Sequence, residues 1–568
     1  MKTKQLTLNK TNTKMILLGN EAVVRGALEA GVQFVATYPG TPSSEIGDTF
    51  SLLKKQANKN SADFYFEYSI NEKVAMEAGI GASFSGLKTL IAMKNFGLNV
   101  ASDALLPFVY TGTKGPTVVV VADDPSCHSS GQAEENTRAF ANLAHIPILE
   151  PADPQECKDF TKLAFEISEK FNIPIMVRTT TRVNHQSSAV KFGKIEKPKT
   201  KARFIKNYNQ FVTMPPRLLD MHDELLVKLE KIKNYAEKSN INKIYFPKLK
   251  SKIGIITSGV SCLHAMEALN HFNSKVPLLK LGIFYPLAEK KIKDFIKNLD
   301  KVLIIEELEP YLENKVREFA KDANCKLKIL GKNVLPESRE LRPETVFGAV
   351  AGLLGKKHNL PSATQLKPLK RFPGLCPGCP YWSVFNGVKQ AIKEAGLTQD
   401  DVIFGGGIGC YMLSSFAPHK LQDYLFCMGA SIGIAHGIKK AVNDKKQGKG
   451  DQKLISFVGD SSFFHAGMPA LANIVHNNSN PIIIIMDNQI TAMTGHQPYP
   501  GIEYAGKKEK GKKVKIEEVI KALGVENLEI IDTPNDYKKF ISVLKTYLHK
   551  NELAVIISRH PCIRIPKQ

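Results

Sequence analysis

Two apolar strands in the C-terminal third of the sequence are each followed by an oxygen-bearing side chain. Asp460 follows the run Leu454 to Val458, and Asn488, 28 residues after Asp460, follows the run Pro481 to Met486. Because ligands of open α/β sheets bind where the carboxyl ends of parallel strands meet, we expect both side chains at that edge. Carboxylate, carboxamide and carbonyl oxygens, such as the carbonyl of Ile490, are ligands that Mg²⁺ takes while it bridges to phosphates. The pattern therefore predicts a magnesium and diphosphate site.

The turn around Asp460 resembles the signature of thiamine diphosphate enzymes, which is Gly-Asp-Gly followed at a set distance by Asn. A Gly459-Asp460 pair alone is an ordinary strand-ending turn, but the matched distance to Asn488 favours the cofactor site. Ser461 replaces the third glycine of the signature, and this small residue still permits close approach of a phosphate. A helix expected to begin near Ser462 would direct its N-terminus at the diphosphate.

Four of the nine cysteines stand in contexts that suit ligation. Cys376 and Cys379 form a Cys-Pro-Gly-Cys pair, Cys410 follows 31 residues later after a glycine-rich run, and Cys562 lies 74 residues after Asn488. Such a pair could be a redox dithiol, half of a zinc site or half of an iron–sulfur site. The other five cysteines are expected at ordinary buried apolar positions, and they are Cys127, Cys157, Cys262, Cys325 and Cys427.

An acidic residue, Glu72, opens a stretch rich in Ala and Gly near the N-terminus. Considered alone, Glu72 is a favourable acidic residue in the first turn of a helix. Its setting resembles that of the carboxylate in thiamine enzymes that promotes the reactive tautomer of the aminopyrimidine. By this resemblance Glu72 is the predicted activating group, and Glu77 is the alternative.

Longer motifs across nearly the whole chain resemble the indolepyruvate type of 2-oxoacid:ferredoxin oxidoreductase. They are Thr37 to Ser44, Asn71 to Ala75, Cys376 to Pro380, Cys427 to Ser431 and Thr491 to Pro498. The resemblance implies that Thr41 contacts the substrate, although Thr41 could equally be part of a structural turn. It implies that Thr494 and Gly495 bind the cofactor together with Gly459 and Ser461. It also implies that the four cysteines hold one 4Fe-4S cluster, with zinc as the alternative.

The reaction implied by the resemblance is oxidative decarboxylation of a 2-oxoacid, such as indolepyruvate, to an acyl-CoA with reduction of ferredoxin. The implied cofactors are thiamine diphosphate, Mg²⁺ and the cluster, and coenzyme A is a co-substrate. A smaller beta subunit is the implied partner, in a heterotetramer or a dimer of heterodimers.

Two departures from the family pattern concern electron transfer and substrate choice. Large subunits of this type usually continue into a ferredoxin-like domain, whereas this chain stops six residues after Cys562, so a separate ferredoxin or a companion subunit is expected to take the electrons. Tyr381-Trp382 stands where the family more often has His-Arg, which leaves the oxoacid side chain open.

Two other classes of function fit part of the pattern. A non-oxidative thiamine-dependent decarboxylase or carboligase would share Asp460, Asn488 and Glu72 but would need no cluster, so the four cysteines argue against it. A basic interaction subunit without catalysis would keep the fold, and retention of all the expected polar groups argues against it.

The elements that must position these side chains read as alternating strands and helices. At 568 residues the chain is too long for one core. Alternation of strands with helices predicts parallel, doubly wound α/β sheets. The family resemblance further implies that these sheets form two thiamine-diphosphate-binding-fold domains separated by a transketolase C-terminal-like α/β domain. The expected ranges are 14–190 for the pyrimidine-binding domain, 191–250 for a linker with a helix, 251–356 for the transketolase C-terminal-like domain, and 357–568 for the diphosphate-binding domain.

Composition and charge limit the classes of binding partner and the cellular compartment that we expect for this protein. The formal charge of +22 arises from 77 Lys and Arg against 55 Asp and Glu. The lysines are scattered along helices without aromatic interleaving, which favours solvated helix faces, then an acidic protein such as ferredoxin, and argues against nucleic acid. No apolar run approaches the roughly 20 residues of a membrane span, and the N-terminus lacks the apolar core of a secretory signal, so a cytoplasmic protein is expected.

Overall fold

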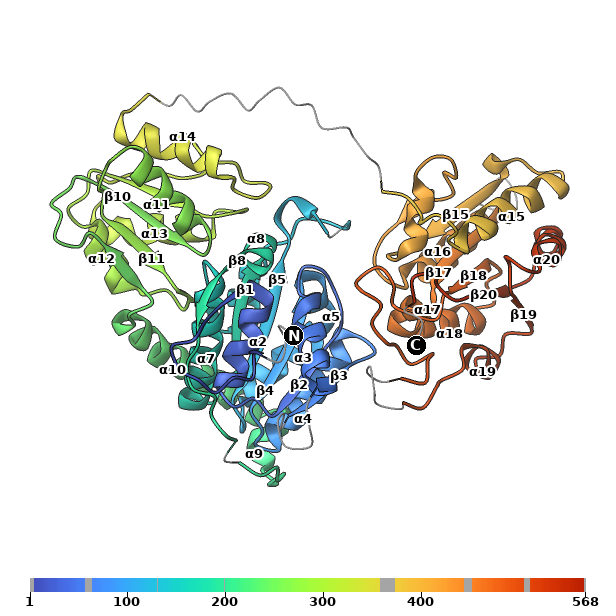
Figure 1. Ribbon diagram of the computed structural model, residues 1–568, viewed down its shortest axis with the longest axis horizontal. Helices are drawn as coiled ribbons and strands as arrows, with labels where there is room; N and C mark the ends of the chain where they lie inside the picture. Colours follow the sequence, from blue (N-terminus) through green and yellow to red (C-terminus); the bar gives the residue numbers. More distant parts are fainter. Residues whose placement is uncertain are drawn as a thin grey trace. The chain divides into compact units, whose positions relative to one another are not determined.

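The computed structural model describes residues 5–56, 64–129, 131–198, 200–357, 373–443, 452–504 and 511–565. The chain divides into two compact units, residues 1–365 and 366–568. Each unit is built from sheets flanked by helices, as Figure 1 shows.

The first unit contains a seven-stranded sheet in the order β12-β6-β7-β5-β4-β2-β3. Its strands are β2 (Phe34–Thr37), β3 (Tyr65–Tyr68), β4 (Thr89–Lys94), β5 (Thr117–Asp123), β6 (Ile148–Leu149), β7 (Ile175–Thr180) and β12 (Ile283–Tyr285). All pairings are parallel except that of β12 with β6. Helices α2 (Gly19–Glu29) and α7 (Pro154–Phe171) pack together, as do α4 (Glu72–Phe84) and α5 (Asn95–Thr111). Because helices cover both faces, the central strands are almost wholly apolar.

A five-stranded sheet in the order β14-β13-β10-β11-β9 completes the first unit. Its strands are β9 (Lys243–Tyr245), β10 (Ile253–Ser258), β11 (Leu278–Leu281), β13 (Lys301–Ile305) and β14 (Lys328–Leu330), with β9 antiparallel to β11. Helices α11 (Ser261–His271) and α14 (Pro343–Leu354) pack together, and so do α12 (Glu289–Ile296) and α13 (Tyr311–Ala323). The long helix α10 (Arg217–Lys238) precedes this sheet, and β1 (Lys14–Leu18) pairs with β8 (Ser187–Lys191) in a separate ribbon.

A buried ion network joins the two sheets of the first unit. The Arg138 guanidinium donates to both oxygens of Glu150 at 2.7 Å, to Ser258 Oγ at 2.9 Å and to the Glu307 carbonyl at 3.3 Å. Burial opposes ionisation of Glu150, but the charges of Arg138 and Arg178 prevail and lower its pKa to about 2. These pairs fix the two sheets against each other at the carboxyl ends of β7 and β10.

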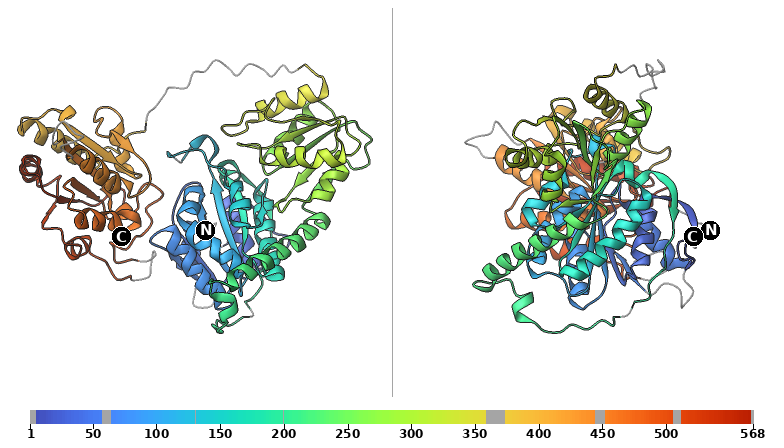
Figure 2. Two further views of the ribbon diagram at one scale, coloured as in Figure 1. Left: turned by 180° about the vertical axis from the view of Figure 1, so that it is seen from behind. Right: turned by 90° about the vertical axis from the view of Figure 1, so that its left-hand side faces the viewer.

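The second unit is a six-stranded parallel sheet in the order β16-β15-β17-β18-β20-β19. Its strands are β15 (Val402–Gly406), β16 (Tyr424–Leu425), β17 (Lys453–Gly459), β18 (Ile482–Asp487), β19 (Asn527–Ile531) and β20 (Ala554–Arg559). Helix α15 (Tyr381–Glu394) packs with α20 (Tyr537–His549), and α16 (Ala430–Asn443) packs with α18 (Met468–His476). The helices flanking the sheet are visible from further sides in Figure 2.

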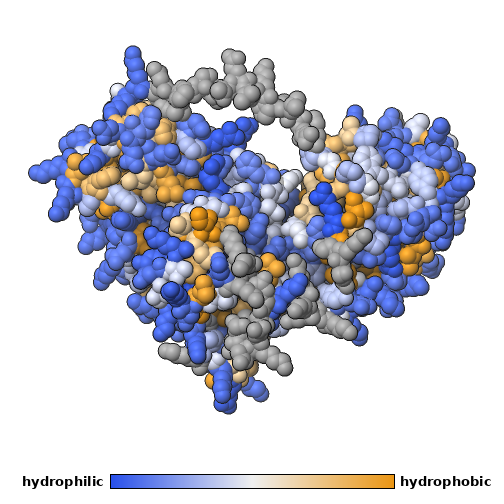
Figure 3. Space-filling view, viewed as in Figure 1, coloured by the Kyte–Doolittle hydropathy of each residue, from blue (hydrophilic) through white to orange (hydrophobic). Residues whose placement is uncertain are grey.

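The predicted fold class, parallel doubly wound α/β sheets, is confirmed. The domain boundaries stay predictions, because β9 from the expected linker joins the five-stranded sheet and β12 from the expected central domain extends the seven-stranded one. Within the described residues, no helix is both long and apolar enough to cross a membrane. The face in Figure 3 is mostly hydrophilic, with apolar side chains gathered in patches.

Candidate active site

The predicted magnesium residues lie at two adjacent strand ends of the second unit. β17 and β18 are parallel neighbours in which Gly459 pairs with Met486, so Asp460 and Asn488 both follow at the carboxyl edge. The Asp460 carboxylate accepts the backbone N–H of Ser461 at 2.7 Å and that of Gln489 at 2.8 Å. These two hydrogen bonds fix the turn after β17 to the turn after β18.

The helix after β17 begins at Asp460, two residues before the predicted start at Ser462. Gly459 is extended (φ −74°, ψ 158°) and serves as the N-cap residue, so the carboxylate of Asp460 stands in the first turn, where a negative charge is favourable. The observed start therefore agrees with the expected start near Ser462 to within two residues.

Asp460 is a buried carboxylate in need of a positive charge. It is 2 % exposed, and burial together with the nearby Asp487 carboxylate raises its pKa well above the usual range. Asp487 is neutralised by Arg559 at 2.6 Å, whereas Asp460 forms no ion pair within the described ranges. Asn488 is 6 % exposed, and its Oδ1 accepts the N–H of Ile490 at 3.2 Å. A hard cation bound to these oxygens would relieve the buried charge.

The turn after β18 continues into a second tight segment that contains Thr494 and Gly495. Thr494 Oγ1 donates to Gln497 Oε1 at 2.6 Å, and the Gln497 amide donates back to the Thr494 carbonyl at 2.9 Å. Gly495 has φ +129°, a conformation that favours glycine. The segment is therefore shaped by its own hydrogen bonds and leaves the backbone of Gly495 uncovered by a Cβ.

The four predicted ligand cysteines lie close enough to influence one another electrostatically. Burial, and then the charges of Cys379, Cys562 and Cys376, raise the pKa of Cys410 to about 12. Cys410 follows β15, and the N–H of Cys562 donates to the Asn488 carbonyl at 3.0 Å, which ties the last cysteine to the magnesium turn. Within the described residues, no group of three or more His, Cys, Asp or Glu side chains is arranged to hold a metal ion.

The five remaining cysteines are not all buried as predicted. Cys157 and Cys262 are buried and Cys127 is half-buried, but Cys325 and Cys427 are exposed because each lies in a turn, after α13 and before α16 respectively. Trp382 lies beside the Cys-Pro-Gly-Cys turn, where its indole N–H donates to the Cys376 carbonyl at 3.2 Å.

In the first unit, Glu72 is the first residue of α4, as the sequence predicts. The Asn71 side chain caps the helix by accepting the N–H of Val74 at 2.9 Å. Glu72 is 4 % exposed, whereas the side chain of Glu77 is 50 % exposed and lies 3.9 Å from Lys73. Gly97 in α5 makes room for the Glu72 carboxylate, because a Cβ there would lie 2.6 Å from Glu72 Cγ and 2.8 Å from Oε1.

The loop that follows β2 contains Thr41. Asn20 Nδ2 donates to the Pro42 carbonyl at 2.7 Å, and Ser43 Oγ donates to the Gly40 carbonyl at 2.8 Å, so the backbone on both sides of Thr41 is fixed. Thr41 itself is partly exposed at the carboxyl edge of the seven-stranded sheet.

Two residues missed by the sequence reasoning, Lys94 and Asn95, lie at the same sheet edge as Thr41. Lys94 ends β4, and its side chain runs against Gly40, where an added Cβ would lie 2.9 Å from Lys94 Cδ. Burial lowers the pKa of Lys94, and the charge of Glu72 opposes the shift. Asn95 is fully buried, and both polar atoms of its side chain lack a hydrogen-bond partner in the described part of the chain. Their position just after an apolar run, at the same sheet edge as Thr41, was the available signal.

Known protein families match most of this chain. Three families match: pyruvate flavodoxin/ferredoxin oxidoreductase, thiamine diphosphate-binding, over residues 25–251; the indolepyruvate oxidoreductase domain over 243–353; and the C-terminal TPP-binding domain of thiamine pyrophosphate enzymes over 407–558. Indolepyruvate oxidoreductase subunit IorA of Methanothermobacter marburgensis is 40% identical over 97% of this chain and 87% of its own length. The same subunit of Pyrococcus horikoshii is 40% identical over 98% of this chain and 86% of its own.

A solved structure of 2-oxoglutarate:ferredoxin oxidoreductase from Magnetococcus marinus, with 2-oxoglutarate, coenzyme A and succinyl-CoA bound, is a more distant neighbour. It is 18% identical, covers 60% of this chain and 65% of its own, and has a TM-score of 0.49.

Proposed function

Since the chain belongs to the family of the indolepyruvate oxidoreductase subunit IorA, a family of thiamine-diphosphate-dependent 2-oxoacid:ferredoxin oxidoreductases, we propose that it oxidatively decarboxylates an aryl 2-oxoacid such as indolepyruvate. The product is an acyl-CoA, and ferredoxin takes the electrons. The observation that carries this proposal is the convergence of Cys376, Cys379, Cys410 and Cys562 on the turns that bear Asp460 and Asn488.

Asp460, Asn488 and the Ile490 carbonyl hold Mg²⁺ in this proposal. The support is the buried Asp460 carboxylate, which has no ion pair in the described residues and whose pKa is raised by burial and by Asp487. Gly459, Ser461, Thr494 and Gly495 contact the diphosphate, and the uncovered backbone of the two glycines suits close approach of phosphate oxygens. Thiamine diphosphate supplies a carbon nucleophile and an electron sink for decarboxylation.

Glu72 shares a proton with a ring nitrogen of the aminopyrimidine in this scheme. Its burial at the N-terminus of α4 holds the carboxylate in one place, and Gly97 provides the space that it occupies. The unpartnered amide of Asn95 is a further cofactor contact. Thr41 and Lys94 contact the carboxylate of the 2-oxoacid, because a hydroxyl and an ammonium at the same sheet edge suit an anion.

The four cysteines would hold one 4Fe-4S cluster, which would supply one-electron transfer when bound. Binding to iron would hold the Cys410 thiolate ionised although burial raises its pKa. A zinc ion at the same thiolates is the alternative, and it would need all four sulfurs at about 2.3 Å from one ion.

Our expectation about partner proteins rests on the names of the relatives. IorA is named as a subunit, so we expect a smaller beta subunit, in a heterotetramer or a dimer of heterodimers, with coenzyme A as co-substrate. A reaction that reduces ferredoxin suits the cytoplasm.

The test is reduction of a viologen dye by the purified complex supplied with thiamine diphosphate, Mg²⁺ and coenzyme A under anaerobic conditions. Indolepyruvate and phenylpyruvate are expected to reduce the dye faster than pyruvate or 2-oxoglutarate. Release of an aldehyde without dye reduction would identify a non-oxidative decarboxylase instead. Failure of every tested 2-oxoacid to support dye reduction would refute the proposal.

A further inference from the structure

An open pocket of about 1110 Å³ lies at the amino ends of the strands of the five-stranded sheet. Among its lining residues, Ser251 and Lys252 directly precede β10, Pro277 precedes β11, and Asn298 precedes β13. Ligands of open α/β sheets bind at the opposite, carboxyl edge, and small-molecule pockets usually measure about 300–1,000 Å³. Position and size therefore favour a macromolecular partner.

The rim of this pocket is cationic. Five lysines line it, against two acidic residues, Glu237 and Asp294. The Glu237 carboxylate already accepts the backbone N–H groups of Lys290 and Lys291, each at 2.8 Å, in the first turn of α12. Lys238, Lys250 and Lys290 are exposed and form no ion pair or side-chain hydrogen bond within the described ranges. These ammonium groups are therefore free to meet an external anion.

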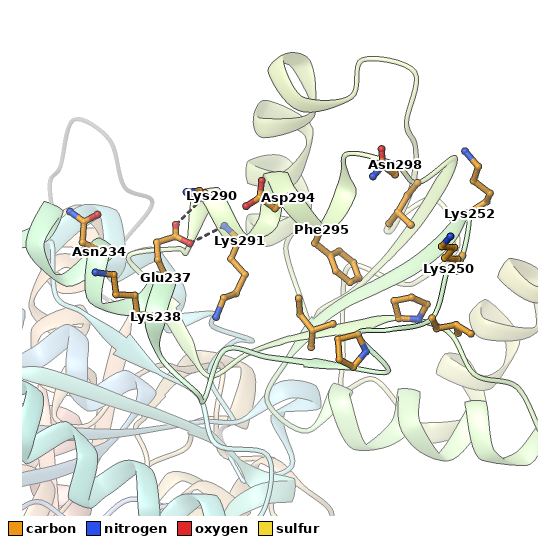
Figure 4. Close-up of a pocket in the computed structure, with 16 residues that line it drawn as sticks. Asn234, Glu237, Lys238, Lys250, Lys252, Lys290, Lys291, Asp294, Phe295 and Asn298 are labelled. Carbon is orange, nitrogen blue, oxygen red and sulfur yellow. Dashed lines mark hydrogen bonds between the residues drawn. The ribbon is translucent and has the colours of Figure 1, made fainter.

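The lysines stand in two groups with an apolar surface between them. Figure 4 shows Lys238, Lys290 and Lys291 toward one end of the pocket, Lys250 and Lys252 toward the other, and Phe295 in the middle. Ile244, Pro247, Leu249, Pro277 and Leu299 extend the apolar part. Leu249 is 40 % exposed, so this floor is accessible to a partner.

We propose that this surface docks an acidic segment of a protein partner that places one apolar side chain between two groups of carboxylates. A second copy of the chain fits poorly, because each copy carries a net charge of +22. Nucleic acid fits less well, since Phe295 is the one aromatic side chain in the lining and base binding relies on successive stacking platforms. The inference goes beyond the proposed reaction, which uses none of these residues.

The experiment measures binding of a fluorescein-labelled oligoglutamate peptide with one central phenylalanine to the full-length chain by fluorescence anisotropy, at low and high salt. The double variant K238E/K250E is expected to weaken binding about tenfold, since two exposed attractive contacts are lost and charge reversal adds repulsion. Replacing the peptide phenylalanine by serine should weaken binding further. The control K114E/K321E changes the net charge equally at exposed lysines outside the pocket and should bind the peptide like the wild type.

Three results would overturn the inference. They are absence of peptide binding by the wild type, equal weakening in both double variants, and an oligothymidylate that binds as tightly and loses as much in K238E/K250E. The last would indicate nucleic acid. Circular dichroism melting curves check that all chains are folded, and unchanged dye reduction by both variants separates failure of this inference from failure of the proposed reaction.

Discussion

Replacement of Gly97 by Ala tests the position of Glu72 without changing any charged group. A Cβ at position 97 would lie 2.6 Å from Glu72 Cγ and 2.8 Å from Oε1, well inside van der Waals contact. Either the carboxylate moves or α5 moves, and extra atoms in a packed interior cost about 1–3 kcal/mol. A displacement of about 1 Å in a catalytic group can lower the rate about a hundredfold. We therefore expect G97A to lose about two orders of magnitude in kcat.

The assay is viologen-dye reduction by the assembled complex, with thermal melting of the same samples. G81A is the matched control, because Gly81 lies in α4, the helix of Glu72, and no atom would come within 4 Å of its added Cβ. G81A should keep full activity and gain up to about 1 kcal/mol in stability, since Ala is the better helix former. A G97A enzyme with wild-type kcat, or a G81A enzyme that loses activity equally, would refute the role given to the Glu72 carboxylate.

Further substitutions test the remaining groups. Because burial and Asp487 raise the pKa of Asp460, the folded metal-free chain holds this proton more tightly than the unfolded chain, so its melting temperature should fall as pH rises above about 4. In D460N this fall should shrink, and Mg²⁺ with thiamine diphosphate should stabilise the wild type alone. K94M should raise KM for the 2-oxoacid about 10- to 100-fold, the usual loss of a charged hydrogen bond, with kcat reduced less. R138M should lower the free energy of urea unfolding by about 3–5 kcal/mol, since it leaves Glu150 buried and ionised without its main partner.

The sequence predicted a helix or strand correctly where a local pattern, such as an apolar run or a capping residue, marked that element. The apolar runs Leu454 to Val458 and Pro481 to Met486 located β17 and β18 to within one residue, and the Asn71 cap agrees with the predicted start of α4 at Glu72. The adjacency of Asp460 and Asn488 followed from the rule for parallel sheet edges, and the register of β17 with β18 bears it out.

The residues that sequence reasoning missed depend on tertiary contacts. In the sequence Lys94 looks like an ordinary polar residue at the end of a strand, and its approach to Glu72 arises only because α4 packs against β4. The two- and three-residue strands β6, β9 and β12 are too short for periodicity, and β12 pairs with β6 more than 130 residues earlier in the chain. Cys325 and Cys427 are exposed because they lie in turns, and the apolar pattern of the sequence did not predict these turns.

The most direct test of the account is the iron, sulfide and zinc content of the anaerobically purified protein, in the wild type, C410S and C325S. About four irons and four sulfides per chain are expected in the wild type and in C325S, whose exposed thiol lies outside the cysteine set, and their loss is expected in C410S. A wild-type protein that holds only zinc, a colourless protein that resists reconstitution, or a C410S variant that keeps its full iron and sulfide would contradict the proposed electron-transferring site.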